Sequence, residues 1–174
     1  AAYGLASQPF ITLAGVLSRT LRPVFNEAVA QGDVRRQRQT LLLWLTAAAA
    51  VLVSGLVLLI VFSTWLVELV LAEAFWDAVR FLPWIGASYV IQGLQQAFEA
   101  VIFAQRRTRR FLVVWSISSA TALTLYLLWI PAYGAMGAAW ATFAALCASF
   151  VTTVVLSGVL PRLLQGRPLG EASP

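Results

Sequence analysis

Long uncharged runs of apolar residues alternate with short charged segments along this chain. Residues 41–67 contain neither a charged residue nor a proline. At 1.5 Å per residue a helix over that run reaches about 40 Å, more than the roughly 30 Å hydrocarbon core of a bilayer. Residues 81–98 and 111–161 are also free of charge. The pattern predicts membrane-spanning helices.

Proline and glycine divide the longest of these runs. Pro131, Gly134 and Gly137 lie near its middle, and such residues interrupt helices, so we expect two helices joined by a tight turn. The predicted fold is an all-α membrane protein, a bundle of about five transmembrane helices within residues 1–164. The expected spans are about 5–30, 41–67, 78–104, 111–130 and 135–160. Residues 165–174 are predicted to be a disordered cytoplasmic tail.

Composition supports the membrane interpretation. Hydrophobic residues make up 60% of the chain and charged residues 11%, whereas a soluble domain has about 25% charged residues. The net charge of +5 does not predict nucleic-acid binding, because the arginines lie at the ends of apolar runs. The chain begins with Ala1 inside a segment that already reads as membrane protein, so we expect a fragment of a longer chain.

Arginine placement predicts the orientation of the spans. The segments 31–40 and 104–110 and the C-terminal end are rich in arginine, whereas Arg80 is the lone basic residue of the opposite loops. Because cytoplasmic loops carry an excess of basic residues, we expect these arginine-rich segments and the C-terminus to be cytoplasmic. Trp65, Trp84 and Trp129 then lie near the outer interface, and Trp44 near the inner one.

Two polar stripes within the spans are the candidate functional features. The stripe in the first helix recurs at spacings of three and four and comprises Gln8, Thr12, Gly15, Arg19, Arg22 and Asn26. A polar stripe in a span faces a bundle interior or an aqueous cavity, because lipid penalises it. Arg19 lies about 20 Å along the axis from Gly32, which makes it the stronger candidate for ligand contact. Alternatively, Arg22 reaches the interface and Arg19 pairs with a carbonyl or an acid.

The stripe in the third helix is made of amides and one acid. It comprises Ser88, Gln92, Gln95 or Gln96, and Glu99. These residues predict a cavity wall in which Gln92, Gln96 and Glu99 bind substrate with the first stripe. Hydrogen bonds between helices, or an interfacial salt bridge of Glu99, are the structural alternatives.

The inventory of reactive residues argues against an enzyme. The chain has no histidine and one cysteine, Cys147, so His/Cys metal sites and histidine-based triads are excluded. No paired-carboxylate motif, nucleophile elbow or P-loop is present. We therefore expect no catalytic residues, no metal and no cofactor.

One turn resembles a known family. Residues 128–142 read Leu-Trp-Ile-Pro-Ala-Tyr-Gly-Ala-Met-Gly-Ala-Ala-Trp-Ala-Thr. This is similar to the turn between the last two helices of the polysaccharide biosynthesis flippases, which belong to the multidrug/oligosaccharidyl-lipid/polysaccharide exporter superfamily. Pro23 followed by Gly32 and a basic loop resembles the eighth helix and its exit in that family. Residues 74–78, around Trp76, and 105–107, around Arg106, also resemble segments of that family. The glycine that is usual in each of those family segments is absent here.

The resemblance implies helices 8–12 of a twelve-helix, two-bundle transporter in the bacterial cytoplasmic membrane. Such proteins translocate polyprenyl-diphosphate-linked oligosaccharides through a cationic cavity for cell-surface polysaccharide synthesis. The implied partners are the lipid-linked sugar, membrane lipid and the N-terminal transmembrane half of the same protein. The alternatives are an ion-coupled drug exporter of the same superfamily, and a membrane-embedded transferase or assembly subunit.

Overall fold

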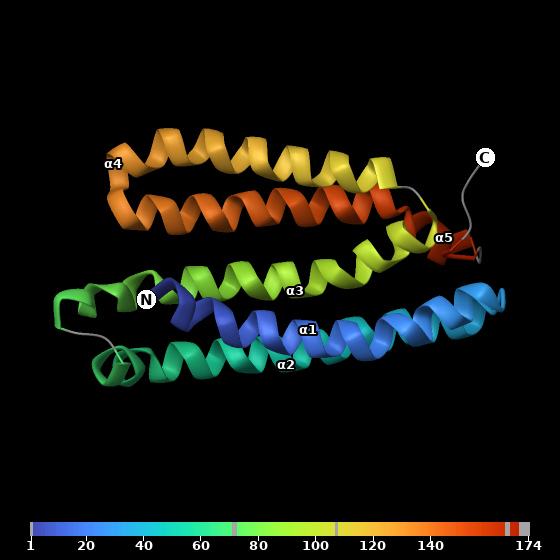
Figure 1. Cartoon of the computed structure of the whole chain (residues 1–174), viewed down its shortest axis with the longest axis horizontal. Helices are drawn as coiled ribbons and strands as arrows, with labels where there is room; N and C mark the ends of the chain where they lie inside the picture. The colour runs from blue at the N-terminus through green and yellow to red at the C-terminus, as the bar shows by residue number, and fades with distance from the viewer. Residues whose placement is uncertain (1, 71–72, 107, 166–167, 171–174) are drawn as a thin grey trace.

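The chain folds into helices that run side by side along one long axis (Figure 1). The structure is a computed structural model and describes residues 2–70, 73–106, 108–165 and 168–170. All of its regular elements within those ranges are helical. They are α1 (Ala2–Ala30), α2 (Val34–Val70), the 3-10 helix η1 (Glu73–Arg80), α3 (Leu82–Ala104), α4 (Thr108–Ser157) and α5 (Val159–Gln165).

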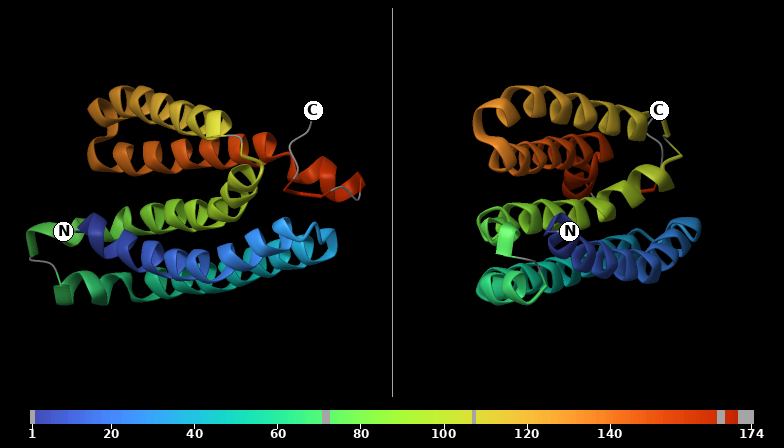
Figure 2. Two further views of the ribbon diagram at one scale, coloured as in Figure 1. Left: turned by 45° about the vertical axis from the view of Figure 1, so that its right-hand side comes forward. Right: turned by 60° about the vertical axis from the view of Figure 1, so that its left-hand side comes forward.

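The helices form two groups that share α3. Helices α1, α2 and α3 contact one another, whereas α4 packs on α3. Figure 2 shows the α4 hairpin on one side of α3, with α1 and α2 on the other. The α1–α2 connection, the start of α4 and α5 all lie at the same end of the bundle, which we call the arginine-rich end.

Gly32 and Asp33 form the turn from α1 to α2. Gly32 has φ +69°, and its N–H donates to Val29 O while that of Asp33 donates to Ala28 O. These two bonds are the Schellman pattern that ends a helix at a glycine. The Asp33 carboxylate then accepts from the backbone N–H of Arg36 at 2.9 Å, which satisfies one of the unpaired donors at the start of α2.

Helix α4 is a hairpin. This agrees with the two helices and the tight turn that Pro131, Gly134 and Gly137 predicted. Gly134 leaves the helical region at φ 58° and ψ −134°, so residues 108–133 and 135–157 form two arms (Figure 1). The arms approach closely because Gly137 has no side chain: a Cβ there would lie 2.3 Å from Trp129 O. A hydrogen bond of 2.8 Å between the Tyr126 and Thr142 hydroxyls also joins them. Pro131 stays inside the first arm.

The structure corrects three expectations. The third span begins at Leu82 rather than near residue 78, because residues 73–80 form the separate helix η1. Trp44 is 1% exposed because it lies in the apolar core between the helices, so it does not present its ring outward as an aromatic-belt residue does. The predicted disordered tail is wrong for Gln165, which ends α5, and for residues 168–170, where Leu169 is fully buried. Residues 166–167 and 171–174 lie outside the described ranges.

Within the described part of the chain, two stretches are long and apolar enough to cross a membrane, Val34–Val70 and Arg109–Ser157. Their outward faces carry large apolar side chains that the rest of the chain leaves uncovered, among them Val61, Leu127 and Val155. The buried core holds α1, α2 and α3 together through side chains such as Phe10 and Leu52.

The close approach of the α4 arms leads to a stability prediction. Gly137→Ala should lower the free energy of unfolding by about 1–3 kcal/mol, because the added Cβ meets backbone rather than a movable side chain. Gly15→Ala is the matched control, since Gly15 is also helical and a Cβ added there would have no other atom within 4 Å. That change should be neutral or stabilising, as alanine favours helix over glycine by about 1 kcal/mol. Thermal unfolding in detergent measures both, and equal stability of the two variants would contradict the close approach.

Candidate functional site

A groove lies between α1, α3 and the first arm of α4, and we call it the polar groove. Its volume is about 370 Å³. The residues that line it are Ile11, Ser18, Arg22, Gln92, Gln96, Glu99, Ala100, Phe103 and Trp115. Four of these, Arg22, Gln92, Gln96 and Glu99, are substrate-binding candidates predicted from the sequence. Arg22 of the first stripe therefore shares one groove with Gln92, Gln96 and Glu99 of the second.

Helix periodicity explains the polar side of the groove on α3. Gln92, Gln96 and Glu99 recur at spacings of four and three and thus share a helix face. Gln95 lies beside them and is buried, and its amide donates to Glu99 Oε1 at 2.8 Å. Among the described residues the Gln95 Oε1 atom has no hydrogen-bond partner. Ser88 instead donates back to Trp84 O of its own helix, so it acts within α3 and not in the groove.

The Arg22 guanidinium is held against an aromatic ring. Its Cζ atom lies 4.8 Å from the centroid of the Phe103 ring, within the range of a cation–π interaction. Phe103 in turn stacks on Phe111 with ring centroids 4.7 Å apart. The start of α4 therefore braces the ring that orients Arg22.

A second pocket continues from the polar groove toward the arginine-rich end, and we call it the arginine pocket. Its volume is about 560 Å³. Its lining comprises Arg22, Asn26, Val29, Ala30, Phe103, Ala104, Arg106 and Gly170. Arg22 and Phe103 belong to both pockets. Among the described residues, the lining of the arginine pocket has two arginines and an asparagine and no carboxylate, which is a donor set for an anion.

Arg106 has an unusual backbone conformation. Its φ is +55°, a left-handed value that non-glycine residues seldom adopt. Its N–H donates to Phe103 O at 2.9 Å, so a tight turn ends α3 and turns the chain toward α4. Glycine would adopt this backbone conformation without strain, and strained residues often occur at functional sites.

The sequence candidates do not all come together. Asn26 lines the arginine pocket with Arg22. Arg19 is exposed on α1 and lines none of the four pockets described for the chain. Within this chain Arg22 lines the two polar pockets and Arg19 lines neither; which of the two contacts a ligand stays a prediction. Sequence reasoning missed Phe103, Arg106 and Trp115, and only the basic segment after residue 104 hinted at one of them.

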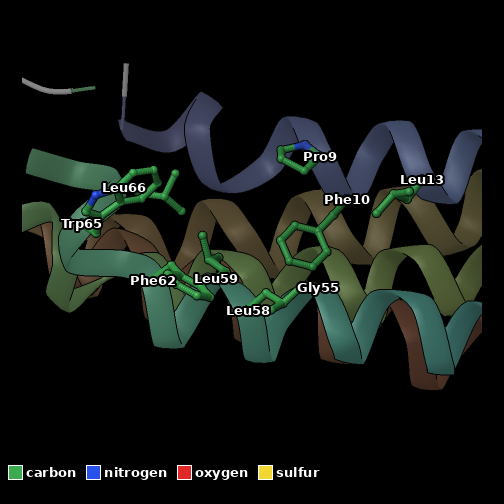
Figure 3. A pocket seen from close by; sticks show the side chains of 9 residues that line it. All are labelled: Pro9, Phe10, Leu13, Gly55, Leu58, Leu59, Phe62, Trp65 and Leu66. Carbon is green, nitrogen blue, oxygen red and sulfur yellow. The ribbon is translucent and has the colours of Figure 1, made fainter. Parts of the chain in front are cut away.

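The opposite face of α1 borders a groove of different chemistry. Figure 3 shows its nine lining residues, among them Pro9, Phe10, Leu58 and Trp65, which come from α1 and α2. The groove has a volume of about 480 Å³ and offers almost no polar group. Helix α1 therefore separates an apolar groove from the polar one.

The described residues hold no group of three or more His, Cys, Asp or Glu that could bind a metal ion. Comparison with protein-family models, with curated proteins and with solved structures finds no match. The fold and the site define the class: an all-helical bundle, with two stretches able to cross a membrane and a polar groove continuous with an arginine pocket.

A double-mutant cycle tests the contact between Arg22 and Phe103. We expect the Arg22→Met and Phe103→Leu substitutions to couple by about 0.5–2 kcal/mol, because each removes one partner of the cation–π pair. The measurement is thermal unfolding of the two single variants and the double variant in detergent. Arg22→Met with Phe98→Leu is the control, since Phe98 contacts Phe150 instead. Additive effects in the first cycle would show that the ring does not hold the guanidinium.

Proposed function

We propose that this chain is a membrane-embedded bundle of a flippase for polyprenyl-diphosphate-linked oligosaccharides. The observation that carries the proposal is the position of Arg22. Its side chain lines both the polar groove and the arginine pocket, so a cation lies on a polar path through helices that are otherwise apolar. The resemblance of residues 128–142 to the polysaccharide biosynthesis flippases supports the same function.

A bacterial cytoplasmic membrane is the proposed location. Two stretches have the length and hydropathy to cross a bilayer, and side chains such as Leu69 and Leu123 are more than half exposed. A soluble monomer rarely leaves contiguous apolar surface of this extent in water. We place the arginine-rich end in the cytoplasm, because basic residues gather on that side of a membrane.

The diphosphate group is the part of the substrate that needs the arginines. It carries fixed negative charge, which hydrocarbon penalises heavily. Guanidinium groups form forked hydrogen bonds to phosphate oxygens, and Arg22 and Arg106 line one pocket from α1 and from the end of α3. The amides Gln92 and Gln96 farther along the polar groove offer donors and acceptors that suit sugar hydroxyls.

The exposed polar residues on α1 are an argument that a second helical bundle packs against this chain. Gln8, Thr12 and Arg19 are exposed, although lipid penalises polar groups in a span. In a two-bundle transporter these residues face the cavity between the bundles, where alternating access takes place. The N-terminal transmembrane half is therefore the proposed partner.

Glu99 supports a second candidate function. It is the acid in the polar groove, and a drug exporter needs a buried acid to bind a cationic drug or to couple transport to protons. Arg22 shares that groove and would repel a cationic drug, so the flippase is favoured. Binding of tetraphenylphosphonium that Glu99→Gln abolishes and Arg22→Ala strengthens would favour the exporter instead.

The proposed topology can be tested by cysteine labelling in intact cells. In a Cys147→Ala background, a cysteine at position 133 should react with an impermeant maleimide added outside. A cysteine at position 108 should react only after the cells are permeabilised, because it lies in the arginine-rich segment that we place inside. Labelling of 108 from outside, with 133 protected, would reverse the orientation.

The role of Arg22 can be tested by native mass spectrometry of the chain with a polyprenyl diphosphate. Arg22→Ala should weaken binding about 10- to 100-fold, since a charge-assisted hydrogen bond contributes about 1.5–3 kcal/mol. Arg22→Lys should recover part of it, because the charge remains and the fork is lost. Arg109→Ala is the matched control, because Arg109 is exposed and lines none of the described pockets. Unchanged binding in Arg22→Ala would remove this residue from the mechanism.

A further inference from the structure

Residues 168–170 are tied to the arginine-rich end through their backbone, and we call them the strap. The N–H of Leu169 donates to Gln37 Oε1 at 2.8 Å. Its carbonyl accepts from Gln105 Nε2 at 3.0 Å and from Arg162 Nη1 at 2.8 Å. The three anchoring side chains belong to α2, to the C-cap of α3 and to α5, and are all buried. Every polar backbone group of Leu169 is therefore satisfied by a side chain of another element.

The same anchors also hold the helix ends. Gln37 donates to Ala28 O at the end of α1, and Gln105 donates to Ser157 O at the end of α4. Buried amides of this kind need partners. The strap thus joins a polar network that reaches α1, α2, α3, α4 and α5 at one end of the bundle, in which Gln105 Oε1 has no partner among the described residues.

The strap also packs tightly on α1. A Cβ at Gly170 would lie 2.3 Å from Val29 Cγ1 and 2.8 Å from Val29 Cγ2. Valine in a helix has one strongly preferred rotamer, so Val29 cannot turn away. Gly170 is therefore the residue that lets the strap lie against α1 at this point.

Gly170 and Val29 both line the arginine pocket, together with Arg22 and Arg106. We propose that the strap is a gate: when docked, its Gly170 forms part of the wall of the arginine pocket and narrows the opening at the cytoplasmic end, and release of the strap widens that opening for an anionic headgroup from the cytoplasm. The inference rests on the proposed function for the identity of the ligand. The gate itself rests on the strap, its anchors and the shared pocket.

The contacts that hold the strap are of a kind that can break and form again while the helices stay folded. They hold the strap by hydrogen bonds from amides and a guanidinium, and Leu169 contributes the buried apolar side chain. Water can replace hydrogen bonds at the end of a bundle, so such a segment can open locally while the helices stay folded.

Thiol accessibility tests the gate without any ligand. The reporter is Ala104→Cys, a residue that lines the arginine pocket, in a Cys147→Ala background. The measurement is its rate of modification by an anionic methanethiosulfonate in nanodiscs. Gly170→Ala should raise the rate at least about tenfold, because the Cβ clash lifts the strap from α1. Adding Val29→Ala removes both methyl groups of the clash and should return the rate toward the original value.

Two further variants complete the design. Arg109→Cys is the matched reporter, exposed in the same segment and outside the pocket lining, and its rate should not depend on the strap. Ending the chain after residue 167 should open the pocket as Gly170→Ala does, and it replaces that variant if Gly170→Ala does not fold. The gate would be overturned if the cysteine at residue 104 were modified at the same rate in the original chain, in Gly170→Ala and in the chain that ends after residue 167.

Inorganic pyrophosphate separates the gate from the proposed function. With the strap displaced, pyrophosphate should slow modification at residue 104, and Arg22→Ala should abolish that protection. Strap-dependent accessibility without any protection by pyrophosphate would support the gate and count against the diphosphate site. Protection with no dependence on the strap would overturn the gate and leave the diphosphate site supported.

Discussion

The structure depends on one constraint, which is that polar groups on apolar helices must find partners or a polar cavity. A charged or amide side chain that faces hydrocarbon costs free energy, and one buried without a partner costs more. In this chain such groups gather at two places. One is the seam between α1 and α3, where Arg22, Gln92 and Glu99 line the polar groove. The other is the arginine-rich end, where Gln37 and Gln105 bind backbone groups of neighbouring elements.

The seam between α1 and α3 is connected to the arginine-rich end, because Arg22 and Phe103 line both the polar groove and the arginine pocket. The arginine pocket begins at Arg22 and ends at the strap, while the polar groove leads from Arg22 along α3. A cation at the junction of two polar cavities suits a site that an anion passes through. On the opposite face of α1, the groove of Figure 3 is lined by apolar side chains. An amphiphile whose head is anionic and whose tail is a hydrocarbon matches these two chemistries.

Close backbone approaches position both cavities. Gly137 lets the arms of α4 meet, because a Cβ there would strike Trp129 O. Gly93 lets α3 approach the other two helices, since its Cβ would lie 2.4 Å from Leu52 Cδ1 and 3.2 Å from Ala14 Cβ. Small residues at such contacts are typical of helices that pack without a hydrophobic driving force between them. The contact of Gly93 with Ala14 holds α3 against α1, and both of these helices line the polar groove.

The sequence by itself determined the long helices and the turns between several of them, but not η1 or α5. Uncharged runs of sufficient length predicted long helices, and Gly32 and Gly134 predicted the turns where a left-handed φ occurs. The 3.6-residue period also predicted that Gln92, Gln96 and Glu99 share a face. These features are local, because they depend on neighbours within one or two helical turns.

The tertiary structure alone decided which polar residues meet. Arg19 and Arg22 lie three residues apart on one helix. The sequence of α1 alone could not tell which of them lines the groove, because the rotation of α1 against α3 puts Arg22 in the groove and leaves Arg19 exposed. Phe103 and Arg106 became part of the site through the turn after α3, which no periodicity describes. Residues 168–170 were predicted to belong to a disordered tail, but Gln37, more than a hundred residues earlier, accepts hydrogen bonds from Leu169 and Gly170. Such pairings depend on how distant helix ends come together, and local pattern carries no information about them.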